Sequence, residues 1–235
     1  MLEINQLKKL YTPTTGIHET TISIPHGQTV AFVGPNGSGK STLFNIIGRI
    51  LKADSGKCLL DGVEIKSLRL SDIGFLPENT YLLEEFTPPQ MLYFINTMKE
   101  LGASSDDVKE LMHCFGIDSF QQKKIKSLSQ GMRKRVALAC TLLGTTKLLV
   151  LDEPLNALDI DSVLAFKDRL KEHKERGAVI MLSSHILDFL DSNVERVVFL
   201  EQGRILEICD SFPGSDRVED LYRKRFIANK ISTAE

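Results

Sequence analysis

The sequence contains few cysteines and little net charge, and each of these two features argues against a class of protein. The four cysteines are scattered and form no C-x-x-C pair, which argues against a structural metal site and against a disulfide framework. Scattered cysteines fit a reducing cytosol. The net charge of −2 argues against a dominant nucleic-acid-binding face.

No segment has the length and continuous apolarity of a membrane span. The most apolar region, residues 136–151, is interrupted by the polar stretch 144–147. The first nine residues have no apolar centre and no small-residue cleavage site, so we expect no secretory signal there. We therefore expect any role at a membrane to be performed from outside the lipid.

An apolar content of 42% over 235 residues is enough for one large core, or for a core with an appended subdomain. Short β-rich or alternating runs predict strands at residues 2–7, 20–24, 28–33, 148–151, 179–182 and 194–200. A hairpin is predicted over 57–65, with its turn at Asp61-Gly62. The run 148–151 is apolar throughout, as expected of a strand that is buried on both faces.

Helical periodicity dominates the middle of the chain, residues 87–143. Pro88-Pro89 favours a helix start, and Ser104 and Ser129 are natural N-cap residues. The sequence therefore predicts an α/β protein with a mostly parallel core that is interrupted by a helical insertion.

A glycine-rich loop follows the predicted strand 28–33. It matches the pattern G-x-x-x-x-G-K-[ST] at every fixed position, with residues Gly34, Pro35, Asn36, Gly37, Ser38, Gly39, Lys40 and Ser41. Glycines let successive N–H groups point at phosphate oxygens, and the next helix adds its positive dipole end. Lys40 supplies a charge for the β- and γ-phosphates, and Ser41 offers a hydroxyl to Mg²⁺. Apolar spacing predicts that this helix extends to residue 51 and ends at residues 54–56.

Two acidic residues, Asp152 and Glu153, directly follow the apolar strand 148–151. Packing does not explain them, because each carboxylate at the end of a buried strand needs a partner. Next to a phosphate loop, Asp152 can hold the Mg²⁺ shell and Glu153 can polarise an attacking water.

These features, together with the segment Leu128–Met132, resemble the ATP-binding-cassette (ABC) ATPase family, and the resemblance covers nearly the whole chain. Residues 34–41 look like its Walker A loop, and 148–152 look like its Walker B strand. Glu153 is placed like the catalytic glutamate. Residues 128–132 resemble the LSGGQ signature, in which Ser129 and Gly131 can contact the γ-phosphate.

Further segments resemble family motifs in the family's order. Residues 155–159, ending in Asp159, are similar to the D-loop, and 183–185 are similar to the segment that carries the switch histidine, His185. Tyr11 is placed like the aromatic residue that stacks on adenine. The resemblance implies that Lys40, Glu153 and His185 act in catalysis. It also implies that ATP contacts residues 34–42, including Thr42, together with Tyr11, Ser129, Gly131 and Asp159.

The sequence departs from the family pattern at two places. Gln130 and Met132 stand where the signature more often has glycine and glutamine, while Ser129 and Gly131 are kept, so we expect the signature to work. Glu78 stands where the family has the Q-loop glutamine. Its carboxylate can still ligate Mg²⁺ or a water, so the implied metal ligands are Ser41, Glu78 and Asp152. The Leu-Pro-Glu form resembles the branch that serves ABC-2-type exporters.

The resemblance implies a P-loop NTPase core with an N-terminal antiparallel β subdomain and a helical insertion subdomain. We expect one ABC ATPase domain, with a core at 1–78 and 144–210, a helical subdomain at 79–143 and a C-terminal helical tail at 211–235. Family membership also implies a dimer, of identical or different cassettes, that sandwiches ATP and Mg²⁺.

The expected role is to power transport, with export favoured, through a separate transmembrane permease subunit. That role places the protein in the cytoplasm, on the inner face of the cell membrane, with no nucleic acid as partner. An alternative is a non-transport ABC ATPase that acts on nucleic acid or ribosomes, and another is a non-hydrolysing regulatory nucleotide binder. The intact Lys40, Asp152, Glu153 and His185 argue against the last of these.

Overall fold

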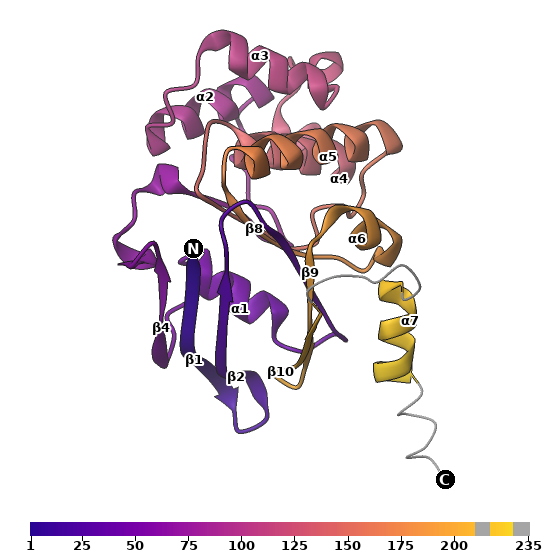
Figure 1. Cartoon of the computed structure of the whole chain (residues 1–235). Helices are drawn as coiled ribbons and strands as arrows, with labels where there is room; N and C mark the ends of the chain where they lie inside the picture. Colours follow the sequence, from indigo (N-terminus) through magenta and orange to yellow (C-terminus); the bar gives the residue numbers. More distant parts are fainter. Residues whose placement is uncertain (210–216, 228–235) are drawn as a thin grey trace.

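A computed structural model describes residues 1–209 and 217–227, which form two β-sheets and a set of helices around them (Figure 1). The antiparallel sheet has the order β2-β1-β4-β5, with β1 (Leu2–Thr12), β2 (Thr15–Ile24), β4 (Ser55–Leu60) and β5 (Val63–Glu64). The larger sheet has the order β10-β9-β3-β8-β7-β6, with β3 (Thr29–Val33), β6 (Ile73–Leu76), β7 (Leu148–Leu151), β8 (Val179–Ser183), β9 (Arg196–Glu201) and β10 (Arg204–Cys209). All its neighbours pair in parallel except the edge strand β10.

The helices lie on both sides of the larger sheet, as Figure 1 shows. They are α1 (Lys40–Ile47), α2 (Pro88–Lys99), α3 (Ser105–Cys114), α4 (Gln130–Leu142), α5 (Ile160–Glu175), α6 (Leu187–Asn193) and α7 (Val218–Tyr222). Short 3₁₀ turns occur at Ile65–Ser67, Leu70–Asp72, Ile117–Phe120 and Ile125–Ser127, and a π-helical turn at Arg223–Ile227 follows α7. The predicted α/β class, with a helical insertion between β6 and β7, is confirmed. The predicted tail at 211–235 lies partly outside the described residues.

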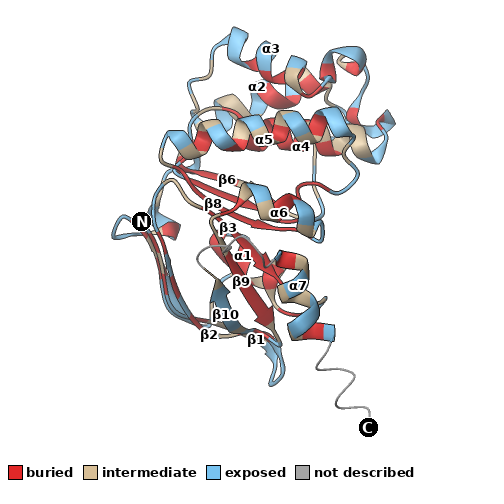
Figure 2. Cartoon of the chain, turned by 45° about the vertical axis from the view of Figure 1, so that its right-hand side comes forward, coloured by how far each residue is buried: buried red, intermediate tan, exposed pale blue. Residues whose placement is uncertain are grey.

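Strand β7 joins two hydrophobic cores because its side chains alternate between them. Leu148 and Val150 pack into the core shared by the antiparallel sheet and α1, whereas Leu149 and Leu151 pack into the core under α4 and α5. Strands β3, β7 and β8 are buried at every residue (Figure 2). The predicted strand buried on both faces is confirmed, and its carboxyl end is fixed between two packed layers.

Helix α1 ends at Ile47, so the prediction that it extends to residue 51 and stops at 54–56 was wrong. Gly48 caps the helix against the Phe75 ring, and a Cβ at this position would lie 2.6 Å from that ring. Arg49 then takes a left-handed conformation with φ of 66°, and the next two N–H groups bond back to Asn45 O. The apolar residues beyond Gly48 keep a helical spacing in the sequence, but they lie outside the helix.

Several other elements differ from the predicted ones. The two N-terminal strands, β1 and β2, are longer than predicted, since they pair along most of their length through several register shifts. The edge strand β10 and the short β6 were not predicted, nor were helices α5 and α6. The last strand of the larger sheet's parallel part begins at Arg196 rather than at residue 194. The hairpin over 57–65 is confirmed, since β4 and β5 pair across Asp61-Gly62.

Candidate active site

A cavity of about 510 Å³ opens at the carboxyl ends of β3, β7 and β8, beside the start of α1. Its lining residues are Tyr11, Thr15, Gly16, Asn36, Gly37, Ser38, Gly39, Lys40, Ser41, Thr42, Glu78, Asp152, Glu153 and His185. Residues far apart in the sequence thus meet at one place, and all but Thr15 and Gly16 were predicted site residues. The remaining predicted residues, Gly34, Pro35, Ser129, Gly131 and Asp159, do not line it.

The glycine-rich loop connects β3 to α1 and wraps around the side chain of Lys40. The Lys40 ammonium donates to Gly34 O at 2.7 Å and to Pro35 O at 3.2 Å. Gly39 precedes the helix with φ of 101°, a conformation that glycine adopts at no steric cost. Burial lowers the pKa of Lys40, and the negative charges of Glu153, Asp152 and Glu78 oppose that shift. The loop therefore holds a cation against the cavity.

Asp152 and Glu153 are held at the end of β7 by the neighbouring strand β8. The Ser183 hydroxyl donates to Asp152 Oδ1 at 2.6 Å and accepts the Glu153 N–H at 2.9 Å. The side chains of both acids are almost fully buried, and Glu153 has a left-handed backbone with φ of 47°. A non-glycine residue in this region stores strain that the surrounding structure must hold.

The Glu153 carboxylate faces His185, which follows β8. Its Oε1 lies 3.1 Å from His185 Nε2, and its Oε2 accepts the His185 N–H at 3.3 Å. Burial raises the pKa of Glu153, while the closeness of His185 opposes the shift. Beyond this contact with His185, the buried Oε1 makes no hydrogen bond among the described residues. An acceptor oxygen is thus held at the wall of the cavity, where it can orient a water.

The oxygen groups in the cavity fit a magnesium ion that is shared with a polyphosphate. The Ser41 hydroxyl and the carboxylates of Asp152 and Glu78 all line it. Within residues 1–209 and 217–227, no group of three His, Cys, Asp or Glu residues could hold a metal by itself. Mg²⁺ usually takes one or two carboxylates together with phosphate oxygens and water, so this set suits it.

The signature segment lies outside the cavity, at the start of α4. Ser129 caps this helix, since its hydroxyl accepts the Met132 N–H at 3.3 Å, and it is exposed. A Cβ at Gly131 would lie 2.7 Å from Ala157 O, so glycine is required where the signature meets the 155–159 segment. Asp159 caps α5 and lies 3.7 Å from Arg135. Within one chain these residues do not join the cavity.

Two residues near the acids were not predicted from the sequence. Ser183 bridges the two acids, and the signal for it was a polar residue at the end of an otherwise apolar strand. Lys134 on α4 is buried, which lowers the pKa of its ammonium, while the negative charges of Asp152 and Glu153 oppose that shift. A basic residue in a helix gives no such signal in the sequence.

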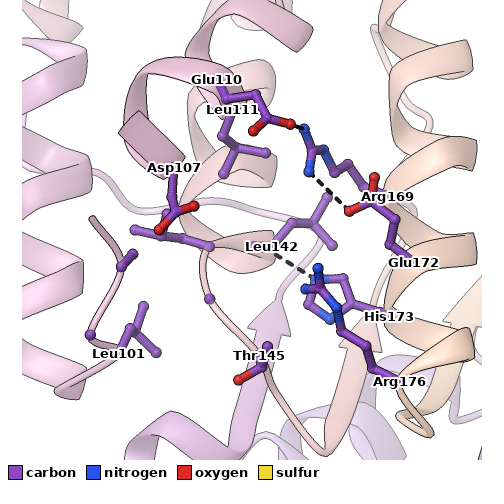
Figure 3. Close-up of a pocket in the computed structure, with 14 residues that line it drawn as sticks. Leu101, Asp107, Glu110, Leu111, Leu142, Thr145, Arg169, Glu172, His173 and Arg176 are labelled. Carbon is purple, nitrogen blue, oxygen red and sulfur yellow. Dashed lines mark hydrogen bonds and ion pairs between the residues drawn. The ribbon is translucent and has the colours of Figure 1, made fainter. Parts of the chain in front are cut away.

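A second cavity, of about 500 Å³, lies between α3, the end of α4 and α5 (Figure 3). Three of its charged groups are paired with one another, because Arg169 contacts Glu110 at 2.6 Å and Glu172 at 2.9 Å. His173 lies beside them, with Nε2 3.2 Å from Leu142 O. None of the predicted site residues lines this cavity, so the first cavity is the candidate active site.

Comparison with known proteins agrees with this geometry. The family described as ABC transporter matches residues 17–156. The lantibiotic transport ATP-binding protein SrtF of Streptococcus pyogenes is 31% identical over 230 residues, which cover 98% of this chain and 99% of that protein. The uncharacterized ABC transporter ATP-binding protein YhcH of Bacillus subtilis is 30% identical, over 88% of this chain and 69% of that protein.

Solved structures show the same fold. An ATP-binding subunit of an ABC transporter has a TM-score of 0.80 and 25% identity, and the match covers 100% of this chain and 98% of that one. A dimeric post-hydrolysis state of the cassette MJ0796, bound to ADP and Pi, has a TM-score of 0.78 and 25% identity, over 91% of this chain and all of that one. The chain therefore belongs to the ABC transporter family, as an ATP-binding subunit with ATPase activity.

Proposed function

We propose that this chain hydrolyses Mg·ATP between two cassettes to power export through a separate membrane subunit. The observation that carries the proposal is the cavity in which the phosphate loop meets Asp152, Glu153 and His185. Export is favoured by the similarity to the lantibiotic transport ATP-binding protein over nearly the full length of both chains. These relatives favour transport over action on nucleic acid or ribosomes.

The reaction is the transfer of the γ-phosphoryl group of ATP to water. Loop N–H groups and Lys40 neutralise the phosphate charge, and Lys40 exchanges its contacts with loop carbonyls for phosphate oxygens. Glu153 orients the water and accepts its proton as the new P–O bond forms and the bond to ADP breaks. His185 holds the Glu153 carboxylate in place. Mg²⁺, held by Ser41 and Asp152 with Glu78 beside it, would stabilise negative charge on the phosphates.

A second cassette completes the site in this proposal. Ser129 and Gly131 lie at the start of α4, where the free N–H groups and the dipole can receive a phosphate, but they do not line the chain's own cavity. Asp159 also lies outside that cavity. The dimeric cassette bound to ADP and Pi supports the pairing of two cassettes. In the proposed pair the chains lie head to tail, so that these residues close the partner's cavity.

The membrane partner is proposed to dock on the helical subdomain, residues 79–143, which moves relative to the core at 1–78 and 144–210. No helix within the described ranges is long and apolar enough to cross a membrane. Exposed apolar side chains nevertheless follow Glu78 in the sequence, at Tyr81, Leu83, Tyr93, Phe94 and Met98. This surface suits an amphipathic helix that brings apolar anchors. Docking there places the protein on the inner face of the membrane.

Burial and ion pairs determine which residues are suitable for a test of this docking. Met91 and Leu92 of α2 are buried, while Phe86 and Ile95 pack partly against the core, so these residues are poor targets. Glu85 contacts both Lys124 and Lys126 at 2.7 Å, so reversing its charge would disturb the subdomain itself. The exposed apolar residues are therefore better targets than the acidic pair Glu84-Glu85.

The docking test uses Tyr81→Ser with Leu83→Ser, and Leu206→Ser on β10 as the matched control. We expect the double variant to lose co-purification with membranes while its ATP binding is kept, and we expect the control to keep both. Equal recovery of the membrane subunit with all forms would place the docking surface elsewhere. Recovery of ribosomes or nucleic acid instead of a membrane protein would contradict the transport role.

The catalytic roles are tested with Glu153→Gln, which keeps the shape of the side chain and removes the carboxylate. This variant should bind ATP, hydrolyse it very slowly and accumulate as a dimer with bound nucleotide. Size-exclusion chromatography with and without ATP measures the dimer, and phosphate release measures turnover. Parent-like turnover would mean that Glu153 is not the catalytic carboxylate.

A further inference from the structure

The hydroxyl of Ser183 is bonded to both acids of the candidate site. Strands β7 and β8 pair in parallel with Leu151 opposite Leu182, so the next residue on β8 lies beside Asp152. The hydroxyl donates to Asp152 Oδ1 at 2.6 Å and accepts the Glu153 N–H at 2.9 Å. Ser183 is fully buried, and the acids are only 3% and 4% exposed. Water therefore has little access to replace either bond.

The direction of the two bonds is fixed by chemistry. An ionised carboxylate can only accept, and a backbone N–H can only donate, so a group between them must do both. A hydroxyl is the smallest side-chain group that can. The bond to Asp152 restrains the rotation of its carboxylate, and the bond to the Glu153 N–H supports a left-handed backbone with φ of 47°. That backbone conformation determines where the Glu153 carboxylate points.

Packing alone gives no reason for a serine at this position. The four residues before it in β8, Val179–Leu182, are apolar and fully buried. A buried hydroxyl is costly unless it is hydrogen-bonded, so an apolar residue would extend the strand at lower cost. Among the described residues, the Ser183 side chain forms hydrogen bonds with the two acids alone. The hydroxyl of Ser183 thus serves to bond the two acids of the candidate site.

We infer that Ser183 is a positioning residue for ATP hydrolysis, which sets the carboxylate of Asp152 and the backbone of Glu153 through one hydroxyl. This inference rests on the roles proposed above for those two acids. The same strand end continues into Ser184 and His185, and His185 contacts the Glu153 carboxylate. Strand β8 therefore holds Glu153 from both sides, by its N–H through Ser183 and by its carboxylate through His185.

The inference predicts a specific pattern for Ser183→Ala. Loss of a group that orients a metal ligand typically costs about 10- to 100-fold in activity or metal affinity, and we expect kcat to fall within that range. ATP binding by the loop, measured with a fluorescent ATP analogue, should change much less. The control is Thr141→Val, which removes a buried hydroxyl on α4 whose hydrogen bond, within the described part of the chain, goes to Ala137 O at 2.8 Å. It should leave kcat unchanged.

Two readouts besides activity separate positioning from a general structural effect. The Glu153 amide loses its acceptor in Ser183→Ala, so its hydrogen exchange should become faster, while amides in the middle of β8 keep their rates. Mn²⁺, used in place of Mg²⁺ with ADP present, should bind more weakly when titrated by electron paramagnetic resonance. The Thr141→Val variant should show neither change.

The outcomes distinguish this inference from the proposed function. If Glu153→Gln retains parent turnover, the proposed roles of the acids fail. If Glu153→Gln is inactive but Ser183→Ala matches the parent in kcat, Mn²⁺ affinity and exchange, the inference about Ser183 is overturned. Ser183→Thr restores a hydroxyl and should recover activity relative to Ser183→Ala. Where Ser183→Ala melts below the assay temperature, Ser183→Cys replaces it, because a thiol of similar size is only a weak donor.

Discussion

The loop-and-acid half of the nucleotide site and its signature half are built in opposite ways. In the first half, the polar groups of Lys40, Asp152 and Glu153 are buried, bonded within the chain and gathered around a cavity. In the second half, Ser129 and Asp159 are exposed residues at helix starts, and neither lines that cavity. Folding of one chain therefore assembles the loop-and-acid half, whereas the signature half remains exposed to solvent.

This difference gives a physical reason for the dimer. Buried polar groups need partners, and the first half supplies them from its own strands. An exposed helix start has water as its partner until a phosphate arrives, so its contribution to binding is realised only on assembly. The two halves should thus respond differently to mutation. Damage to the first half should abolish chemistry in any assembly, and damage to the second should be rescued by a partner.

The largest effect is expected for Lys40→Ala, which removes the cation of the first half. The Lys40 ammonium is buried against the loop, where the charges of three carboxylates act on it, so its loss removes the cation that the loop itself supplies. Loss of one such donor typically costs about 10²–10³ in kcat, and ATP binding should also weaken severely. The control is Lys52→Ala, which changes an exposed lysine just beyond α1. Unchanged Mg-ATPase activity in Lys40→Ala would falsify the assignment of the loop.

A mixing experiment tests the second half directly. Ser129→Arg places a large cation at the exposed helix start, so a dimer made only of this variant should be inactive. Lys40→Ala dimers should be inactive as well. In a mixed dimer, the Ser129→Arg chain supplies an intact loop, and the Lys40→Ala chain supplies an intact signature. These two halves face each other and form one complete site. ATPase activity should return when the two inactive proteins are mixed. Continued inactivity of the mixture would mean that each chain uses its own signature.

A smaller effect is expected at Glu78, an exposed residue at the edge of the cavity, in the segment between β6 and α2. Glu78→Gln keeps an oxygen that can face Mg²⁺ or a water, so it should bind ATP and remain active. Glu78→Ala loses that oxygen and should slow hydrolysis. Steady-state kcat and KM for the three forms measure the difference. Equal values for all three would make Glu78 a bystander.

The sequence predicted the first half of the site better than the second, for the same structural reason. The phosphate loop and the acids after β7 are local patterns, and a parallel sheet brings the carboxyl ends of its strands to one edge. The structure places Lys40, Ser41, Asp152, Glu153 and His185 around one cavity, as predicted. In the proposed dimer the signature contacts a second chain, so its ligand is set by assembly rather than by local sequence.

Other features depend on tertiary contacts that no local pattern records. The end of α1 is set by the approach of Phe75 to Gly48, from a segment distant in sequence. Lys134 is buried near the acids because α4 packs against β6, the neighbour of β7, while its sequence neighbours Arg133 and Arg135 indicate a solvated helix face. The bridging role of Ser183 follows from the register of two strands about 30 residues apart, and that register becomes known only from the fold.

The smallest effect is expected from substitution of His173, which anchors α4, the helix that begins after Ser129, to the core. Its Nε2 lies 3.2 Å from Leu142 O, at the far end of the helix that begins after Ser129 (Figure 3). His173 is buried, and this burial lowers its pKa below the usual 6.5. The folded protein therefore keeps the imidazole neutral at a pH where the unfolded chain already protonates it.

The sign of the pH effect follows from this difference. Below pH 6.5 the unfolded state binds a proton that the folded state does not, so the free energy of unfolding falls as the pH decreases through this range. One such group contributes at most about 1.4 kcal/mol per pH unit.

His173→Gln keeps a donor for Leu142 O and cannot titrate, so urea unfolding at pH 7.5 and 5.5 should show a smaller loss of stability than in the parent. His113→Gln, at an exposed position on α3, is the control and should retain the loss. ATPase activity at pH 7.5 should be unchanged in His173→Gln, because His173 anchors the helix and contacts neither half of the site. An undiminished loss of stability in His173→Gln would show that another group carries the pH dependence.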